Sequence, residues 1–181
     1  GNSALGSNTT ASNNTAVGSG ALVLNTIGDG NTAVGGAALD ANTTAANQTA
    51  VGYDSLTAAT TGGNNTAVGR QSLTAMTTGA NNVAVGFVAG SSVTTGGHNV
   101  LMGRSAGDNI TTADGNTCLG YAAGDDITTG SHNTVIGNLC DVGGGGSAYR
   151  IVMGYSASGG SNDSLLIGRG TTDSQIAFGA T

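Results

Sequence analysis

The sequence has no proline and no tryptophan, and reading its charged residues shows no lysine and no glutamate. Long helices held by Glu–Lys pairs one helical turn apart therefore have no raw material, which excludes a helical bundle. Four Arg and ten Asp give a formal charge of −6, and a chain without lysine is poorly suited to neutralising a phosphate backbone. We therefore expect no nucleic acid partner.

Long apolar runs are also missing. No apolar stretch is long enough to span a bilayer and no basic-then-apolar leader segment is present, so we expect no membrane insertion. Charged residues at 8% are too few, and hydrophobic residues at 38% too many, for a disordered polyelectrolyte. We expect a folded, soluble chain.

What the sequence has instead is glycine, at 34 positions, in a strict internal repeat. An apolar residue followed by glycine recurs at a constant interval, at Gly18, Gly35, Gly52, Gly69, Gly86, Gly103, Gly120, Gly137 and Gly154. Equal intervals without insertions predict that each repeat is one turn of a solenoid. The fold class is thus predicted to be all-β, a parallel β-solenoid of 17-residue coils.

The repeat also sets the expected domain boundaries. The solenoid is predicted over residues 1–155, with an incomplete first coil at 1–12. Beyond it the steps between glycines become shorter, first at Gly168 and again at Gly179, which predicts tapering coils over 156–181. Neither end has an obvious polar cap, so we expect neighbouring segments to continue the assembly.

The residues before each repeat glycine predict a short β-strand with two apolar faces. One face holds the apolar residue next to the glycine, as in Val17, and a β-branched residue two positions earlier, as in Thr15, and we expect it to face a core. The opposite face is also apolar and becomes bulkier toward the C-terminus, at Ala84, Leu101, Cys118, Val135 and Val152. We expect this second face to be covered by other chains, which makes the protein an obligate homotrimer.

A second strand per coil is predicted from an exchange of apolar positions. At the fourth position after the glycine, the early coils have Leu22, Leu39, Leu56 and Leu73, and the later coils have Gly90, Gly107 and Gly124. As the leucine disappears, the seventh position after the glycine changes from Asn42 and Ala59 through Met76 to Val93, Ile110 and Ile127. The exchange keeps a shared interior filled, since a lost Leu would leave a cavity costing on the order of 2–5 kcal/mol.

The polar positions of the repeat predict how each coil closes. The column Asn14, Asn31, Gln48, Asn65, Asn82, Asn99, Asn116 and Asn133 predicts an amide ladder between stacked coils. The repeat glycines predict corners with positive φ. The run Gly143 to Gly146 replaces a Thr-Thr turn without changing the count, so we interpret it as a loosened corner and not a linker.

Residues that could carry catalysis are scarce. His98 and His132 lie in the same column two coils apart, about 10 Å along the axis, so they cannot share a metal ion within one chain, and we interpret them as solvated turn residues. Cys118 and Cys140 occupy different columns and are expected to be buried free thiols. We predict no catalytic residues, and therefore no enzyme.

The aspartates do not recur at fixed spacing, which argues against the calcium sites of some solenoids. Eight of the ten lie within the repeats and are scattered over several columns, at Asp29, Asp40, Asp54, Asp108, Asp114, Asp125, Asp126 and Asp141. A hexapeptide-repeat acyltransferase is also disfavoured, because the six-residue apolar period is absent. No metal and no cofactor are expected.

The column that follows the repeat glycine concentrates the unusual residues of the chain. It contains Tyr53, Arg70, Phe87, Arg104, Tyr121 and Tyr155, and Arg169 follows the shorter step. Arg and aromatic residues alternate at coil spacing, close enough for cation–π stacking. We interpret the column as a seam between chains, with a strip for a ligand such as a sugar as the alternative.

The unit Asn-Thr-Ala-Val-Gly, at residues 31–35 and 65–69, with its Thr-Thr-Gly turn, resembles repeats of phage tail fibres and of bacterial adhesin-like surface proteins. It is also similar to the YadA-like heads of trimeric autotransporter adhesins, over about residues 13–155. The repeat of those heads is shorter than the repeat here, and this sequence contains no heptad stalk and no membrane anchor. The resemblance implies a left-handed parallel β-roll in which three chains pack together.

This resemblance leads to a functional expectation. The chain is expected to be a shaft or receptor-facing segment of an extracellular trimeric fibre, most simply a phage tail fibre in the virion, with a host cell-surface glycan or receptor as a further partner. The alternative is a bacterial surface adhesin or filament subunit. A third alternative, an ice-binding solenoid, is suggested by the Thr-Thr column, but only one threonine per coil should point outward.

Overall fold

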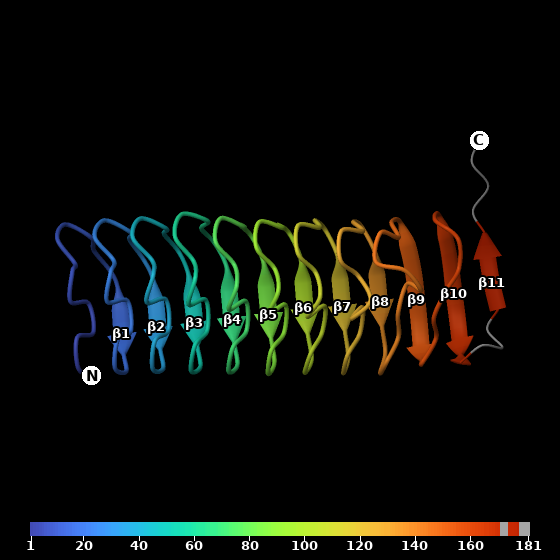
Figure 1. The fold of residues 1–181 in the computed structure, drawn as a ribbon, viewed down its shortest axis with the longest axis horizontal. Coiled ribbons are helices and arrows are strands. Elements are labelled where there is room, and N and C mark those ends of the chain that lie inside the picture. Colours follow the sequence, from blue (N-terminus) through green and yellow to red (C-terminus); the bar gives the residue numbers. More distant parts are fainter. Residues whose placement is uncertain (171–173, 178–181) are drawn as a thin grey trace.

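The chain forms one straight stack of coils that runs from the N-terminus to the C-terminal end of the sheet (Figure 1). The computed structural model describes residues 1–170 and 174–177. Each coil contributes one strand to a single sheet, in sequence order. The strands are β1 Thr15–Val17, β2 Thr32–Val34, β3 Thr49–Val51, β4 Thr66–Val68, β5 Val83–Val85, β6 Val100–Met102, β7 Thr117–Leu119, β8 Thr134–Ile136, β9 Arg150–Tyr155, β10 Ser164–Arg169 and β11 Ser174–Ala177.

The strand register confirms the parallel solenoid and its 17-residue coil. Thr15 pairs with Thr32, and the same interval holds through Ile136, which pairs with Met153. The parallel stack continues past residue 155, because β10 pairs with β9 over the shorter step, Gly168 beside Gly154. β11 then pairs with β10 in the antiparallel direction. Gly179 lies outside the described residues.

The repeat glycines are required by both conformation and space. From Gly18 to Gly154 their φ values lie between 132° and 142°. At Gly86, for example, an added Cβ would overlap the backbone carbonyl of the next repeat glycine, Gly103. Only a residue without a side chain allows successive coils to approach this closely. The predicted positive-φ corner is confirmed.

The two strand faces are the reverse of the expected arrangement. The column that was predicted to be covered by other chains points into the coil: Ala84, Leu101, Cys118 and Val135 are 0% exposed, and Val152 is 1% exposed. The column next to the repeat glycine, which was expected to face a core, points to solvent, with Val17 56% and Leu119 45% exposed. The growing bulk of the inner column is therefore no reason for a trimer.

The predicted exchange of core residues is confirmed in three dimensions. The early leucines at Leu22, Leu39, Leu56 and Leu73 are fully buried, and so are Met76, Val93, Ile110 and Ile127. At Gly107 an added Cβ would lie 2.8 Å from both Leu101 Cδ2 and Ile110 Cδ1. The space of an early leucine is thus filled from two sides in the later coils, and this keeps the interior densely packed.

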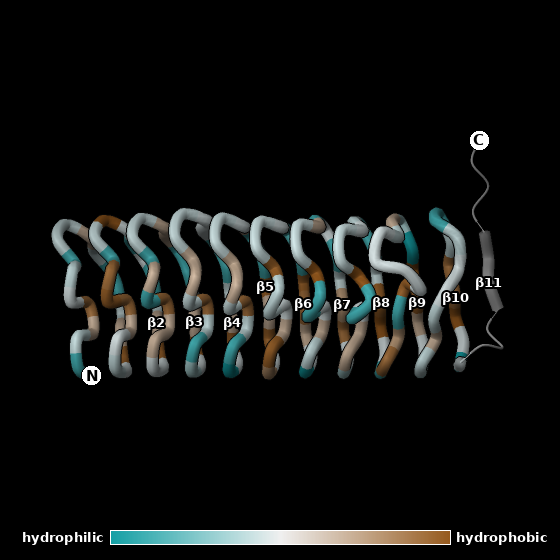
Figure 2. Tube along the Cα trace, viewed as in Figure 1, coloured by the Kyte–Doolittle hydropathy of each residue, from teal (hydrophilic) through white to brown (hydrophobic). Residues whose placement is uncertain are grey.

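The predicted second strand is wrong, because turns take its place. The fourth position after the repeat glycine is left-handed in both kinds of coil, with φ of 51° at Leu56 and 56° at Gly107. A chain with αL residues there cannot be extended, although carbonyl and amide groups still pair between coils, as in Leu56 N–H to Ser72 O at 3.1 Å. The hydropathy pattern of Figure 2 shows each coil alternating between apolar and polar segments.

The amide ladder is confirmed and it is continuous. Each side-chain oxygen accepts the backbone N–H of the next member, from Asn31 N–H to Asn14 Oδ1 at 2.8 Å through Asn133 N–H to Asn116 Oδ1 at 3.0 Å. Each side-chain amide donates to a carbonyl of the following corner, as Asn99 Nδ2 does to Ala113 O at 2.9 Å. Buried side-chain amides thereby satisfy the backbone of the corners.

A shorter, second ladder was not foreseen. Asn25 Nδ2 donates to Asn8 Oδ1 at 3.0 Å, and Asn42 Nδ2 donates to Asn25 Oδ1 at 2.8 Å. The series stops where the next coil has Ala59, and Asn42 Oδ1 is left buried without a donor. This column then becomes apolar, so the second ladder gives way to the hydrophobic filling of the later coils.

The glycine run keeps the coil in register, as expected of a loosened corner. The backbone N–H groups of Thr128, Thr129 and Gly130 all donate to Gly145 O, at 2.9, 3.0 and 2.9 Å. The following strand pairs normally, with Val135 beside Val152.

The crowded interior predicts the outcome of adding one methyl group. Gly107→Ala should destabilise the chain by about 1–3 kcal/mol through overpacking, in addition to about 1 kcal/mol for an αL alanine. Gly20→Ala is the matched control, since its φ is 70° and its nearest neighbours lie 4.0 Å from an added Cβ. Gly107→Ala should cost less in an Ile110→Ala background, where one clashing group is gone. Urea unfolding of Gly107→Ala, Gly20→Ala, Ile110→Ala and the Gly107→Ala/Ile110→Ala double variant measures these losses. Equal losses for Gly20→Ala and Gly107→Ala would contradict the packing account.

Candidate functional site

An uncovered, largely apolar surface lies on the outward side of strands β1 to β10, here called the outer strand face. Its two columns are Thr15, Thr32, Thr49, Thr66, Val83, Val100, Thr117, Thr134, Ile151 and Leu165, and Val17, Val34, Val51, Val68, Val85, Met102, Leu119, Ile136, Met153 and Ile167. Every one of these residues is half-buried or exposed. The first column is mainly threonine and valine and the second is wholly apolar, and an uncovered strip of this length is typical of an interaction surface.

Beside this face, the column after the repeat glycine forms a stacked series, here called the Arg–aromatic ladder: Tyr53, Arg70, Phe87, Arg104 and Tyr121. The Arg70 guanidinium lies 6.0 Å from the Tyr53 ring centroid and 5.6 Å from that of Phe87. The Arg104 guanidinium lies 5.9 Å from the Phe87 centroid and 5.4 Å from that of Tyr121. The predicted alternating stack is confirmed.

The ladder is solvent-exposed and ends at a polar position. Its aromatic residues are between 39% and 56% exposed. Asn138 occupies the next coil, and a separate pair follows, in which Arg169 lies 5.6 Å from the ring centroid of Tyr155, the sixth residue predicted for this column. The structure of a single chain leaves both interpretations of the column, seam and ligand strip, as predictions.

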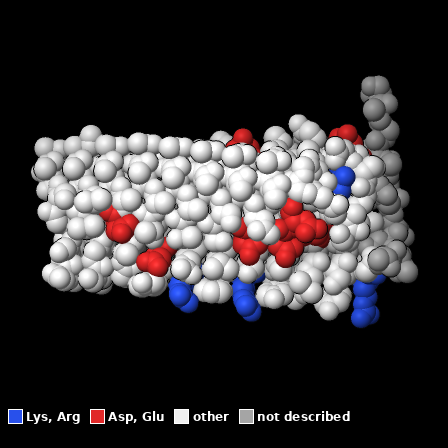
Figure 3. Space-filling view, in the orientation of Figure 1, with Lys and Arg blue, Asp and Glu red and all other residues white. Residues whose placement is uncertain are grey.

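Charge is segregated around the coil. Most basic side chains project from one edge of the stack, and acidic side chains gather mainly on the face next to it, where a basic side chain also lies (Figure 3). Asp40, Asp108 and Asp125 share the fifth position after the repeat glycine in their coils, and Asp54 occupies the second. The edge that carries the Arg–aromatic ladder is thus positive although the whole chain is acidic.

The histidines lie where they were expected. His98 and His132 are exposed, at left-handed corners with φ of 59° and 62°. His132 stacks on the exposed Tyr149, with ring centroids 5.1 Å apart and planes 6° from parallel. Asp114 lies in the coil between them: its Oδ1 accepts the Gly97 N–H at 2.6 Å, and its backbone carbonyl accepts the His132 N–H at 3.0 Å.

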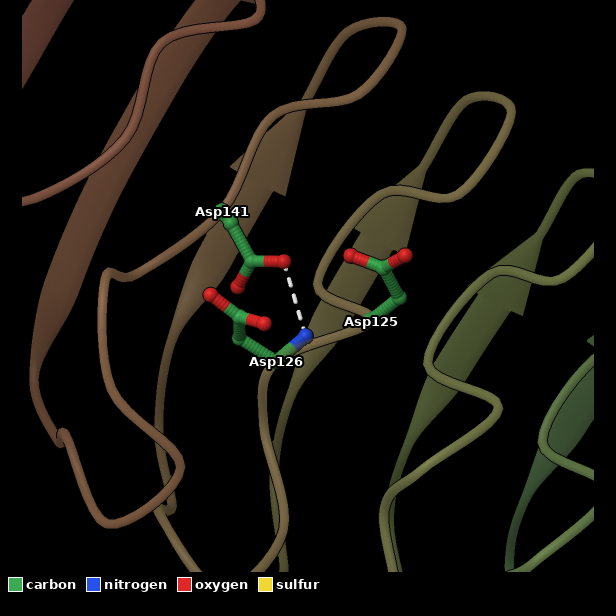
Figure 4. Close-up of side chains that lie close together, drawn as sticks. All are labelled: Asp125, Asp126 and Asp141. Atoms are coloured by element: carbon green, nitrogen blue, oxygen red, sulfur yellow. Dashed lines mark hydrogen bonds between the residues drawn. The ribbon is translucent and has the colours of Figure 1, made fainter.

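Three aspartates that looked scattered in sequence come together. Asp125 and Asp126 in one coil and Asp141 in the next have carboxylate oxygens within 4.8 Å of one another (Figure 4). The sequence argument missed them because they occupy three different columns, yet Asp141 follows the other two by slightly less than one coil. Asp141 Oδ2 accepts the Asp126 N–H at 2.7 Å, and Asp141 Oδ1 accepts the Val142 N–H at 2.7 Å.

Burial governs the chemistry of this cluster. It raises the pKa of Asp141 to about 8, helped by a hydrogen bond with the Asp125 carboxyl and opposed by the two backbone N–H donors. The pKa of Asp108 is raised as well, by burial and then by the charge of Asp125. A carboxyl group that holds its proton at neutral pH is a weak cation ligand.

Both cysteines are buried, as expected, and they do not form a disulfide with each other. Burial, with a smaller contribution from the charge of Asp141, raises the pKa of the Cys118 thiol to about 12. Cys140 Sγ donates to Gly154 O at 2.8 Å. A buried thiol with a high pKa is a poor nucleophile.

The Thr-Thr corners present one free hydroxyl column, as expected. In five of the six pairs, from Thr43 to Thr111, the first threonine donates its hydroxyl to the backbone of the next coil, as Thr77 Oγ1 does to Thr94 O at 3.2 Å. The second threonine is exposed in every pair, at Thr44, Thr61, Thr78, Thr95, Thr112 and Thr129. A single column of hydroxyls is narrower than the flat array that an ice-binding face uses.

No pocket was detected in the described part of the chain. Within these residues there is likewise no helix of a length and apolarity that would span a membrane. The surfaces that remain as candidates for function are therefore open ones, the outer strand face and the Arg–aromatic ladder.

The raised pKa of Asp141 predicts that stability depends on pH. A carboxyl that is protonated when folded but ionises near pH 4 when unfolded makes the folded state progressively less stable as the pH rises from about 4 to about 8. Asp141→Asn, which stays neutral, should flatten this dependence, while Asp163→Asn at an exposed position should not. Urea unfolding at pH 4, 6 and 8 measures the effect; parallel curves for wild type and Asp141→Asn would contradict it.

The buried thiols predict a simple reactivity pattern. In the folded chain, neither thiol should react with a thiol reagent at pH 8. In the unfolded chain, two thiol groups per chain should react. Thr95→Cys, at an exposed corner, is the control and should add one equivalent to the folded chain. If the unfolded chain has no reactive thiol until a reductant is added, the two cysteines form a disulfide and the prediction is wrong.

Comparison of the chain with known protein families, curated proteins and solved structures returned no significant match.

Proposed function

We propose that this chain is a rigid segment of an extracellular fibre built from three identical chains, most simply a phage tail fibre that mediates attachment to a host. The single observation that carries the proposal is the outer strand face, an apolar strip left uncovered along the whole parallel stack. Three chains that meet along this strip would remove it from water, which is the main driving force of obligate assembly.

The chemistry of the face suits close packing of parallel chains. Its outward residues are mainly β-branched, and stiff side chains lose little conformational freedom when they pack. The bulkiest residues, Met102 and Leu119, lie in neighbouring coils, where Met102 is 38% and Leu119 is 45% exposed. The number of chains follows from the resemblance of the Asn-Thr-Ala-Val-Gly repeat to trimeric adhesin heads.

The shape fits a spacer. Ten strands stacked in parallel at about 4.8 Å span roughly 45 Å, with almost every backbone group of the strands paired to a neighbouring coil. Such a rod is stiff because bending it means breaking inter-coil hydrogen bonds. Further fibre segments would extend it at either end.

The proposal is tested at Leu119, whose side chain is outward and can change without opening the core. Leu119→Asp should convert the assembly into a folded single chain, since a threefold axis would bring three carboxylates together. Light scattering should give about three times 17.2 kDa for the wild type and 17.2 kDa for the variant, with an unchanged circular dichroism spectrum.

Two controls separate assembly from folding. Thr129→Asp, at an exposed corner near the same coil, should leave the trimer intact. Leu101→Asp, in the buried inner column, should unfold the chain whether or not it assembles. Wild-type protein that scatters as a single chain at every accessible concentration would overturn the trimer.

A further inference from the structure

The Arg–aromatic ladder contains guanidinium donors that packing along the outer strand face would not use. It holds two of the four Arg residues of the chain, and Arg70 and Arg104 make no contact with a carboxylate in the described residues. We propose that the ladder binds a linear acidic polysaccharide, with Arg70 and Arg104 each holding one anionic group. This inference rests on the proposed role in host attachment and names the chemical class of the receptor.

The stacking leaves the guanidinium groups available at their edges. Arg70 lies between the rings of Tyr53 and Phe87, and Arg104 lies between those of Phe87 and Tyr121, so each guanidinium has an aromatic ring on both sides. The N–H donors of a guanidinium lie in its plane and point away from such rings. They match the paired oxygens of a carboxylate or sulfate, and the rings hold them in place before the ligand arrives.

The same stacking argues against neutral sugars as the ligand. A sugar ring stacks on the face of an aromatic side chain. The Phe87 ring centroid lies 5.6 Å from the Arg70 guanidinium and 5.9 Å from the Arg104 guanidinium, so its faces are already occupied. The exposed phenol groups of Tyr53 and Tyr121 flank the two Arg and can hydrogen-bond to sugar hydroxyls. Recognition through anionic groups is therefore favoured over stacking.

The spacing favours one anionic group per disaccharide. Arg70 and Arg104 are two coils apart in the same column, which places their backbones about 10 Å apart along the axis. This is close to the advance of one disaccharide along an extended polysaccharide. A chain of alternating acidic and neutral sugars would thus present its charges in step with the ladder.

A seam formed by this column against itself is disfavoured by charge. In a parallel threefold assembly, equivalent residues lie at the same height, so Arg70 would meet Arg70 of the other chains without an intervening carboxylate. The column needs an acidic partner, and an acidic polysaccharide supplies one.

The proposal is tested with two tetrasaccharides, one of hyaluronan and one of chondroitin 4-sulfate, and with neutral dextran of similar size. Calorimetry at low salt should show binding of one or both acidic probes and none of dextran. Arg70→Gln with Arg104→Gln should weaken that binding at least tenfold. Arg70→Lys with Arg104→Lys should weaken it several-fold, since lysine keeps the charge but not the paired donors.

The control variant is Arg169→Gln, which removes the same charge outside the ladder and should change the affinity less than twofold. Wild-type protein that binds neither acidic probe overturns the proposal, and so does equal loss in Arg169→Gln and in the double Gln variant. Tight binding of polyphosphate that the double Gln variant retains shows attraction by general charge and also overturns it.

Light scattering of the double Gln variant separates this proposal from the trimer, and thermal melting verifies that the variant is folded. A smaller particle mass for the folded variant identifies the column as an interchain seam and overturns the polysaccharide proposal. If the wild-type chain binds the acidic probes as a monomer, the polysaccharide proposal is supported and only the proposal of a trimer is overturned.

Discussion

Hydrogen bonding between successive coils is the constraint on which the rest of the structure depends. Each coil donates to and accepts from its neighbours in parallel register, so every turn from β1 to β9 must contain the same number of residues. Fixed register places like residues above one another, and this produces the amide ladder, the core columns, the outer strand face and the Arg–aromatic ladder at once. The repeat glycine makes the spacing possible, since no side chain fits between its Cα and the next coil.

Most of the interior could be predicted because the periodicity is strict. Positions such as Leu56 and Ile110 are buried as their exchange along the repeat indicated, and the amide ladder from Asn14 to Asn133 forms as its column indicated. The alternating Arg and aromatic column was equally visible. In each case a residue pattern repeats at coil spacing, and the parallel register of the coils places its members directly above one another.

The direction of the strand faces was harder to predict because both are apolar. A signal was nevertheless present in the sequence. The inner column enlarges from Ala84 to Leu101 just where Leu73 gives way to Gly90, which is what two columns sharing one volume must do. The prediction of a second strand was wrong for a related reason. The position that is Leu in early coils and Gly in later coils has positive φ in both, so the chain turns there and is not extended. The aspartate cluster around Asp141 spans three different columns, so no single column of the repeat indicated it.

The change in the core also determines the order in which coils can be stacked. A perfect tandem repeat has many nearly equivalent pairings, because omitting one coil would still align every strand with a strand. In this chain Leu101 requires the absence of a side chain at Gly90, where an added Cβ would lie 2.6 Å from Leu101 Cδ1 and 3.0 Å from Leu73 Cδ2. If that coil were looped out, Leu101 would face the leucine of an early coil in a space that holds only one of them. The junction between the two kinds of core therefore disfavours pairings that are shifted by a whole coil, and so sets the register of the coils during folding.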